Sequence, residues 1–425
     1  MFDPNRTIVG AIEFGSRKIR VLVGDSQGNG EHVSVIGRGE APADGIVKGE
    51  IANMELVFDR LGSALNEADT ACGGKLNDCA LFVLPVSGCD IAGFTGTGTV
   101  FIKNEDKRIT PEDRAEAHQN ARIHPLAPDR TIINSAESFF TIDDNLRRRD
   151  PVGQTAYKLD AHVHIVHGLI NRLENFRTAV HDSGYEDHVE MVFSPLAAKE
   201  GVLAGEEREN GVIMIDLGAE VTDFAAEYNN GVVASGQIQV GFEHVLNDLA
   251  IGLELPMENC RKIVEDGTLA AAIAEKRTWL DFPGSTGKVR RIPVDSFETI
   301  ASLRLREIFT IIRKQAEAQT DLTALNSGAV LTGGGALYAP AQTILRDVMQ
   351  MSVRIGNPVH VTGAVTGMDD PRYSSIWGAL RIADFYAHYE NAGNNRPLNR
   401  FLTGLNSMMN RLCSTAQDFK ESFRF

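Results

Sequence analysis

Two copies of one pattern, 203 residues apart, constrain the fold of this chain more than any other sequence feature. The first copy reads TIVGAIEF, then Gly15 and Ser16, then RKIRVLVGD; the second reads GVIMIDL, then GAEV, then TDFAAEY. Two apolar runs that flank a short glycine-containing turn are typical of a β-hairpin. Each hairpin is followed by a further strand and then by a helical pattern. The chain is therefore predicted to be a duplicated α/β fold with a cleft between its halves.

A segment of different character interrupts the first half, roughly from Pro85 to Val166. It combines short β-rich runs with one helix, for which Thr110 is a suitable N-cap and Pro111 suits the first helical position. Acidic residues in the first turn favour the same helix start. We therefore predict a small α+β module inserted into the first half.

Length and charge limit the possible functions. A chain of 425 residues exceeds what one hydrophobic core supports, so two or more domains are expected. The net charge of −15 argues against general nucleic-acid binding, because phosphate backbones favour basic surfaces. From Asn391 onward the charge is +3, which leaves the preceding body at −18. The acidic body and the basic tail are therefore expected to contact surfaces of opposite charge.

The cysteine pattern and the hydropathy pattern indicate a compartment. Five cysteines without a CxxC pair fit free thiols in a reducing cytoplasm. The start, MFDPNRTIVG, lacks the apolar core of a secretory signal, and no window approaches 18 apolar residues. The sequence predicts a cytoplasmic protein that lies at most on a membrane surface.

Three glycine-centred turns carry the candidate chemistry. Backbone N–H groups in such turns point at phosphate oxygens, and glycine lets the backbone approach closely. An Asp at a strand end beside them would hold Mg²⁺ through water. The residues are Gly15, Ser16 and Lys18 in the first turn, Asp216, Gly218, Thr222 and Asp223 around the second, and Gly333, Gly334 and Gly335 in the third. No Ser-His-Asp or Cys-His arrangement accompanies them, and AHVHIVH is interpreted as a packed strand rather than a metal site.

These motifs resemble those of the actin-like ATPase superfamily and, within it, the family of the bacterial cell-division protein FtsA. LTGGGALYAP is similar to the adenosine motif, IEFGSRKIRVLVGD to the first phosphate motif and MIDLGAEVTDFA to the second. The inserted module, through INSAESFFTIDDNLRRRDPVGQTAYKLDAHVHIVHG, resembles the family's 1C subdomain. The resemblance implies a duplicated actin-like (ribonuclease H-like) α/β fold with an inserted α+β module and a C-terminal amphipathic helix.

The resemblance covers nearly the whole chain and divides it into subdomains. It implies subdomain 1A over 1–84 completed by 361–388, the 1C module over 85–166, subdomain 2A over 167–245 and 302–360, subdomain 2B over 246–301, a linker over 389–397 and the amphipathic helix over 398–425. In the family, subdomain 2B and the helix after it bind the C-terminal peptide of the tubulin-like protein FtsZ. Arg304 falls where that surface has a basic residue. The 1C module would contact a neighbouring subunit or late divisome proteins.

Several residues depart from the family pattern at the phosphate end. Glu13 stands where the first motif usually has Asp, and its extra methylene crowds a hydrated Mg²⁺. Ala-Glu-Val at 219–221 replaces most of a Gly-Gly-Gly-Thr turn. A carboxylate ~4 Å from a γ-phosphate is repulsive by several kcal/mol at an effective dielectric near 20. Further implied contacts are Gly241, left from a Gly-Gly pair, and Lys262, which matches the adenine-side lysine with a one-residue insertion. ATP with Mg²⁺ is the implied cofactor, and the departures predict weak binding and at most weak hydrolysis.

An amphipathic helix is predicted at the C-terminus, with Arg400 and Arg411 flanking its apolar stripe. The stripe consists of Leu398, Phe401, Leu402, Leu405, Met408, Met409, Leu412, Phe419 and Phe423. Such a helix lies in a membrane interface with its basic residues near anionic headgroups, forms a coiled-coil seam, or docks onto its own body. The polar linker, the basic bias and the resemblance to FtsA's membrane-targeting helix favour the membrane; self-association stays open.

The resemblance implies a protein that tethers FtsZ filaments to the cytoplasmic face of the inner membrane at the septum. It would polymerise or dimerise, depending on nucleotide, and help to recruit the divisome. Two alternatives stay open. A pilus-assembly protein of the PilM type shares the fold and an inserted module but lacks the long terminal helix. A sugar-kinase-type phosphotransferase needs an intact second phosphate turn, against which Ala219 and Glu220 argue.

Overall fold

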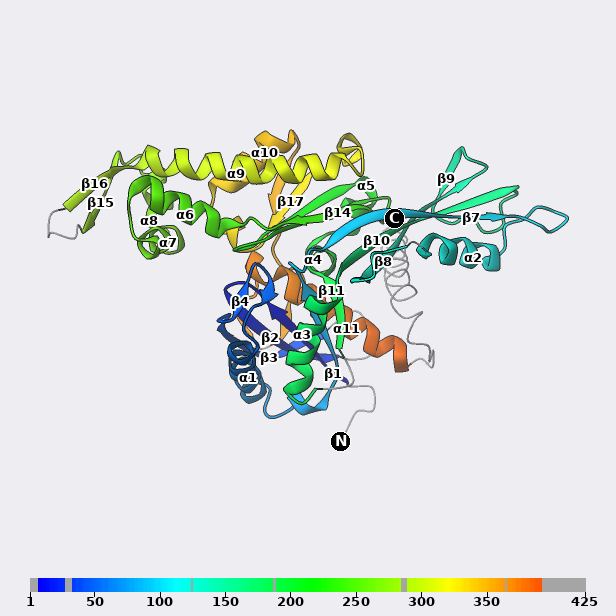
Figure 1. The fold of residues 1–425 in the computed structure, drawn as a ribbon, viewed down its shortest axis with the longest axis horizontal. Helices are drawn as coiled ribbons and strands as arrows, with labels where there is room; N and C mark the ends of the chain where they lie inside the picture. The colour runs from blue at the N-terminus through cyan, green and yellow to red at the C-terminus, as the bar shows by residue number, and fades with distance from the viewer. Residues whose placement is uncertain are drawn as a thin grey trace, which may run out of the picture.

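The computed structural model (Figure 1) describes residues 7–26, 33–123, 125–185, 189–283, 289–363 and 365–391. The predicted tail helix, residues 398–425, lies outside these ranges. The last described helix, α11 (Ser374–Asn391), extends three residues into the predicted linker, which was expected to begin at residue 389.

A six-stranded sheet forms the first half, in the order β11-β6-β1-β2-β3-β19. Its strands are β1 (Thr7–Phe14), β2 (Lys18–Ser26), β3 (Val33–Pro42), β6 (Cys79–Val86), β11 (Val189–Phe193) and β19 (Thr362–Gly363). Helix α1 (Met54–Ala71) packs on β3, and its N-terminus is capped by Asn53, whose side chain accepts from the Leu56 N–H. α3 (Ile170–Asp182) contacts α1.

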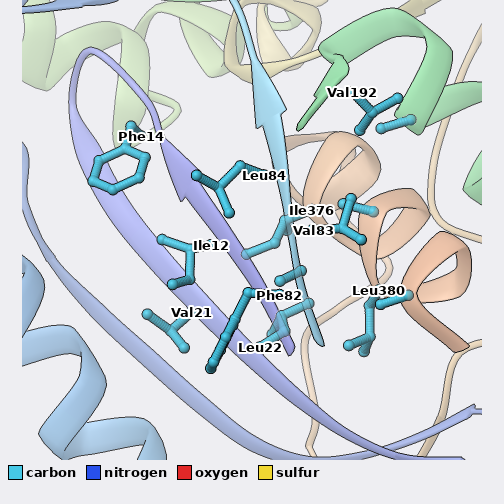
Figure 2. Packing of buried hydrophobic residues seen from close by; sticks show 14 of the residues in the cluster. Ile12, Phe14, Val21, Leu22, Phe82, Val83, Leu84, Val192, Ile376 and Leu380 are labelled. Atoms are coloured by element: carbon cyan, nitrogen blue, oxygen red, sulfur yellow. The ribbon is translucent and has the colours of Figure 1, made fainter. Parts of the chain in front are cut away.

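The core of the first half lies between this sheet and α11 (Figure 2). Phe82 and Val83 of β6 and Ile376 and Leu380 of α11 are buried there. A fully buried side chain of this size contributes about 1.5–3 kcal/mol. The end of the described chain is therefore held on the first half and completes it.

A five-stranded sheet forms the second half, in the order β14-β13-β12-β17-β18. Its strands are β12 (Val212–Leu217), β13 (Thr222–Tyr228), β14 (Gly231–Ile238), β17 (Ala329–Thr332) and β18 (Val353–Ile355). Helices α6 (Phe242–Leu253), α9 (Val294–Glu317) and α10 (Pro340–Met349) share one core cluster with this sheet. α4 (Ser194–Val202) contacts both β12 and α11, so it links the halves.

The two halves repeat one topology, which confirms the predicted duplication. The order β3-β2-β1-β6-β11 in the first sheet corresponds to β14-β13-β12-β17-β18 in the second. The hairpin registers also correspond, because Glu13 pairs with Arg20 in the first and Asp216 pairs with Asp223 in the second. Equivalent positions at the cleft thus carry a Glu and an Arg in one half but two Asp residues in the other.

The inserted module is a four-stranded antiparallel sheet, in the order β7-β10-β8-β9, with one helix against it. Its elements are β7 (Ala92–Phe101), α2 (Pro111–Arg122), β8 (Arg130–Ile142), β9 (Leu146–Arg148) and β10 (Lys158–Leu169). The predicted helix start is correct, because Thr110 and Asp113 form a capping box. Pro85 lies within β6, so the module begins later than its predicted boundary. The module projects to one side of the molecule (Figure 1) and contacts β14 of the second half.

The elements between α6 and α9 project to the opposite end (Figure 1). They are α7 (Met257–Glu265), α8 (Thr268–Ala274), β15 (Trp279–Pro283) and β16 (Val289–Pro293). The remaining short elements are β4 (Ile46–Val47), β5 (Glu50–Ile51), α5 (Gly205–Asn210) and the 3-10 turns η1 (Leu76–Asp78), η2 (Leu322–Ala324), η3 (Gly334–Leu337) and η4 (Pro371–Tyr373).

Candidate functional site

The three glycine turns meet in a cleft of about 710 Å³ between the halves. Each turn follows the end of a strand: β1, β12 and β17 respectively. The two hairpin turns close in the same way, with the Gly15 N–H donating to the Lys18 carbonyl (3.1 Å) and the Gly218 N–H to the Val221 carbonyl (3.0 Å). The duplicated fold therefore brings two equivalent turns to face one cavity.

Most of the predicted nucleotide residues line this cleft: Glu13, Gly15, Ser16, Lys18, Asp216, Gly218, Asp223, Gly333, Gly334 and Gly335. Thr222, Gly241 and Lys262 are not among the lining residues. The Thr222 side chain is fully buried, and its hydroxyl donates to the Val240 carbonyl at 2.7 Å. Lys262 is exposed, because α7 instead turns Val264 and Glu265 towards the cavity. The structure thus places Lys262 outside the site to which the resemblance assigned it.

Two glycines are required by close packing around the second turn. Gly333 has a φ of +83°, and a Cβ there would lie 2.2 Å from Oδ1 of Asp216. A Cβ on Gly241 would lie 2.5 Å from the Ala219 carbonyl oxygen. Gly241 therefore lets α6 begin directly against the second turn, whose carbonyls accept the first N–H groups of that helix. Its role is to shape the turn.

In the first half, the strand-end carboxylate is already neutralised by a neighbouring strand. Arg20 donates to Oε2 of Glu13 at 2.6 Å, and Arg20 also lies 3.6 Å from Glu40. The Glu13 and Arg20 side chains are 15% and 14% exposed. An ion pair this sheltered from solvent is screened little by salt. Glu13 is therefore engaged by a protein cation.

In the second half, burial makes the two paired aspartates harder to ionise. Burial raises the pKa of Asp216 to about 6, although the Ser375 hydroxyl donates to its Oδ2 at 2.9 Å and opposes that shift. Burial also raises the pKa of Asp223 well above its usual range, again opposed by a hydrogen bond, here from Ser87. Burial disfavours a charged carboxylate, and at Asp216 the nearby Arg20 offsets this only in part.

These carboxylates do not fit the hydrated Mg²⁺ that the resemblance implies. A Mg²⁺ ion is held by ionised carboxylates that are free to face it or its waters. Glu13 faces Arg20, whereas the carboxylates of Asp216 and Asp223 accept hydrogen bonds from the Ser375 and Ser87 hydroxyls. Among the described residues, no group of three or more His, Cys, Asp or Glu side chains is arranged to hold a metal ion.

The raised pKa of Asp216 predicts a stability change that depends on pH. A carboxyl whose folded pKa is about 6 and whose ordinary value is 3.8 stabilises the fold only while it is protonated, so this contribution is complete below pH 3.8 and is lost between pH 3.8 and 6. Asp216→Asn should therefore raise the free energy of unfolding at pH 8 by the order of 1–3 kcal/mol and have roughly half that effect at pH 5. Urea unfolding at the two pH values measures this. An equal effect at both values would contradict the assigned pKa.

Side chains also join the two walls of the cleft. Arg17, from the first turn, donates to Glu265 at 2.8 Å and to Glu243 at 3.2 Å. Glu220 accepts from the backbone N–H of Lys48, in the turn between β4 and β5. The expectation that Glu220 faces a γ-phosphate is thus not met, since its carboxylate turns to the opposite wall and is absent from the cleft lining.

Sequence reasoning overlooked the lining residues Arg17, Arg20, Ser87 and Glu265. The position of Arg20 could have been found, because the Gly15 turn fixes the hairpin register and places residue 20 opposite Glu13. The others depend on contacts between segments far apart in the sequence, for which the local pattern carries no signal.

Arg304, the predicted partner-binding residue, lies on α9 outside the cleft. It donates to both carboxylate oxygens of Asp248 on α6, at 2.7 and 3.1 Å, and to Glu307 at 2.6 Å. Two large apolar side chains on the same helices are exposed: Leu303 at 67% and Ile251 at 70%. The surface therefore combines exposed apolar groups with an arginine that is already paired.

Family comparisons match both the module and the second half. A model of the SHS2 domain inserted in FtsA matches residues 88–167, and a model of cell division protein FtsA matches residues 213–378. The chain is 25% identical to cell division protein FtsA of Neisseria meningitidis, over 90% of this chain and 91% of that one. It is 26% identical to FtsA of Escherichia coli, over 88% and 90% of the two chains.

Solved structures share the fold at low identity. The chain resembles one from the PilM-PilN type IV pilus biogenesis complex with a TM-score of 0.56 and 14% identity, over 88% of this chain and 98% of that one. It resembles MreB5 of Spiroplasma citri bound to ADP with a TM-score of 0.54 and 14% identity, over 92% and 100%. These likenesses confirm the actin-like fold. None of the described helices is both long and apolar enough to cross a bilayer.

Proposed function

The chain belongs to the FtsA family of actin-like cell-division proteins, and from this premise we propose that it tethers FtsZ filaments to the cytoplasmic face of the inner membrane at the division septum. The observation that carries the proposal is the FtsA-type module inserted into an actin-like fold, at residues 88–167. The PilM alternative shares the fold alone, at 14% identity. A phosphotransferase role has little support in a cleft whose strand-end carboxylates are engaged by Arg20, Ser87 and Ser375.

Membrane attachment is proposed for the tail, residues 398–425. The tail combines an apolar stripe with basic residues, whereas the rest of the chain carries a net charge of −18. Several half-buried apolar side chains, each worth up to ~1.5–3 kcal/mol, together with ~1 kcal/mol per basic residue near anionic lipid, support reversible binding. Such an anchor would also concentrate the protein on a surface where copies can associate.

The FtsZ peptide is proposed to bind across α6 and α9. Leu303 and Ile251 offer exposed apolar surface there, and Arg304, next to Leu303 in the chain, pairs with Asp248 and Glu307. The ion pairs of Arg304 with Asp248 and Glu307 must weaken for it to receive an acidic group from the peptide. The apolar side chains are therefore expected to carry more of the affinity than the arginine.

This surface predicts which variant loses the peptide. Leu303→Asp should weaken binding of the FtsZ C-terminal peptide by about thirtyfold, the loss typical of a central apolar contact. Fluorescence anisotropy with a labelled peptide measures it. Leu146→Asp is the matched control, since Leu146 is also an exposed leucine, at 41%, but lies in the 1C module. Equal affinities of the Leu303 and Leu146 variants would place the peptide elsewhere.

Nucleotide is proposed to bind through its adenosine end, with weak or absent hydrolysis. The third glycine turn and the apolar side chains Phe242, Leu246 and Val264 remain open to the cleft. A chain of this fold, MreB5 of Spiroplasma citri, has been solved with ADP. Assembly of a scaffold depends on contact surfaces, so slow turnover is compatible with the role.

The engaged carboxylates predict a small effect of metal removal. ATP should bind with dissociation constants that differ by less than about threefold between Mg²⁺ and EDTA, because a metal whose ligands are engaged adds little binding energy. Calorimetry measures this, and a phosphate-release assay should stay near background. Tightening by Mg²⁺ of about tenfold or more, or steady phosphate release, would contradict the assignment.

A further inference from the structure

Five hydrogen bonds that join the facing walls of the cleft pair a donor of the first half, or of the C-terminal segment that completes it, with a carboxylate of the second half. Arg17 donates to Glu265 (2.8 Å) and Glu243 (3.2 Å), the Lys48 N–H to Glu220 (2.5 Å), the Ser87 hydroxyl to Asp223 (2.5 Å) and the Ser375 hydroxyl to Asp216 (2.9 Å).

These donors are of the kinds that bind phosphate oxygens. An arginine beside a glycine turn, a backbone N–H and a hydroxyl are the usual partners of a phosphate. The carboxylates are anions as well, so they can occupy the same donors. Four of the five acceptors belong to the second sheet hairpin or to the start of α6, and one to α7. The second half therefore supplies carboxylates of its own to the donors that could bind a phosphate.

We propose that the cleft is closed by these contacts, here called the latch, and that nucleotide phosphates compete with the latch instead of bridging the halves. A triphosphate that reached Arg17 would have to displace Glu243 and Glu265 from it, and this displacement would part the walls that the Lys48–Glu220 hydrogen bond also joins. The ligand that leaves the latch intact has few or no phosphates and fills the apolar end beside the third glycine turn. The inference rests on the cleft contacts and does not depend on the tethering role.

Hydrogen exchange of the full chain tests the latch, because the Lys48 amide is itself one of its donors. With single-amide fragmentation, that amide is expected to exchange slowly in nucleotide-free protein. Arg17→Ala removes two other contacts of the latch and should speed Lys48 exchange by about tenfold. Addition of ATP with Mg²⁺ to the wild-type protein should leave the Lys48 amide no slower.

Two controls separate the latch from general loosening. Arg306→Ala removes an exposed arginine that pairs with Asp347 at 3.1 Å, away from the cleft, and should leave Lys48 unchanged. Amides of β17 report whether the Arg17 variant keeps its core. Fast exchange at Lys48 that slows only when nucleotide is added would overturn the proposal, as would unchanged protection in Arg17→Ala. Loss of lipid or FtsZ binding alone would bear only on the tethering role.

Discussion

Leu405→Glu is expected to release most of the protein from vesicles that contain anionic lipid. The substitution removes an apolar side chain from the middle of the tail's stripe and adds a charge that repels the headgroups. Loss of ~1.5–3 kcal/mol of burial alone corresponds to a weakening of about tenfold to a hundredfold. Deletion of residues 398–425 should abolish the binding. Co-sedimentation across a series of lipid concentrations measures both.

Asn406→Glu is the matched control for this prediction, because it adds the same charge one residue away on the polar face. It should cost only the repulsion from the headgroups, about 1 kcal/mol. Equal losses for the two variants would show that charge, and not an apolar face, governs binding. Unchanged co-sedimentation of Leu405→Glu would refute the anchor and favour a tail that packs on the body or in a coiled coil.

Lys199→Ala is expected to lower the free energy of unfolding by about 3–5 kcal/mol, the usual cost of breaking a buried ion pair. Lys199 lies on α4, where its ammonium donates to Glu227 of β13 and lies 3.5 Å from Glu200. Arg208 completes the group by donating to Glu200 at 3.0 Å. All four side chains are at most 4% exposed. Without Lys199, the cation that still pairs with Glu227 among the residues the structure describes is Arg208, at 3.9 Å.

Urea unfolding measures this loss of stability, and two further variants show whether the buried ion pairs cause it. Lys314→Ala removes an exposed lysine of α9 and should change stability by less than about 0.5 kcal/mol. Lys199→Met combined with Glu227→Gln removes both charges and should recover most of the loss, since neutral replacement of a buried pair is often tolerated. A loss below about 1 kcal/mol in Lys199→Ala would mean that the buried charges contribute little.

The hairpins and the inserted module could be predicted because their signals are local. Two apolar, β-rich runs flank each of the short turns at Gly15 and Gly218, which predicts a hairpin at each turn. The repeat of this pattern in the second half predicts the duplication. The capping box at Thr110 marks a helix start within four residues of sequence. Such patterns also place the three glycine turns at one cleft, since the ends of equivalent strands meet there.

The charges of the cleft could not be predicted, because their partners come from distant segments. Glu220 was expected to repel a phosphate, but its partner is a backbone N–H 172 residues earlier in the chain. The match of Lys262 to the family's adenine-side lysine requires a one-residue insertion. A shift by one position along a helix turns a side chain by about 100°, so such a match does not fix which way the lysine points. The neutralisation of Glu13 by Arg20 is the exception, since a hairpin register alone implies it.

Recruitment of FtsZ filaments to membrane tests the central claim most directly. Anionic vesicles, FtsZ polymers and this protein are floated together on a density gradient, with and without ATP and Mg²⁺. We expect FtsZ in the vesicle fraction only when the intact protein is present, and in similar amount with or without nucleotide. The chain without residues 398–425 and the Leu303→Asp variant should each fail, the first by leaving the vesicles and the second by leaving FtsZ. FtsZ that stays at the bottom of the gradient with the intact, vesicle-bound protein would contradict the tethering role.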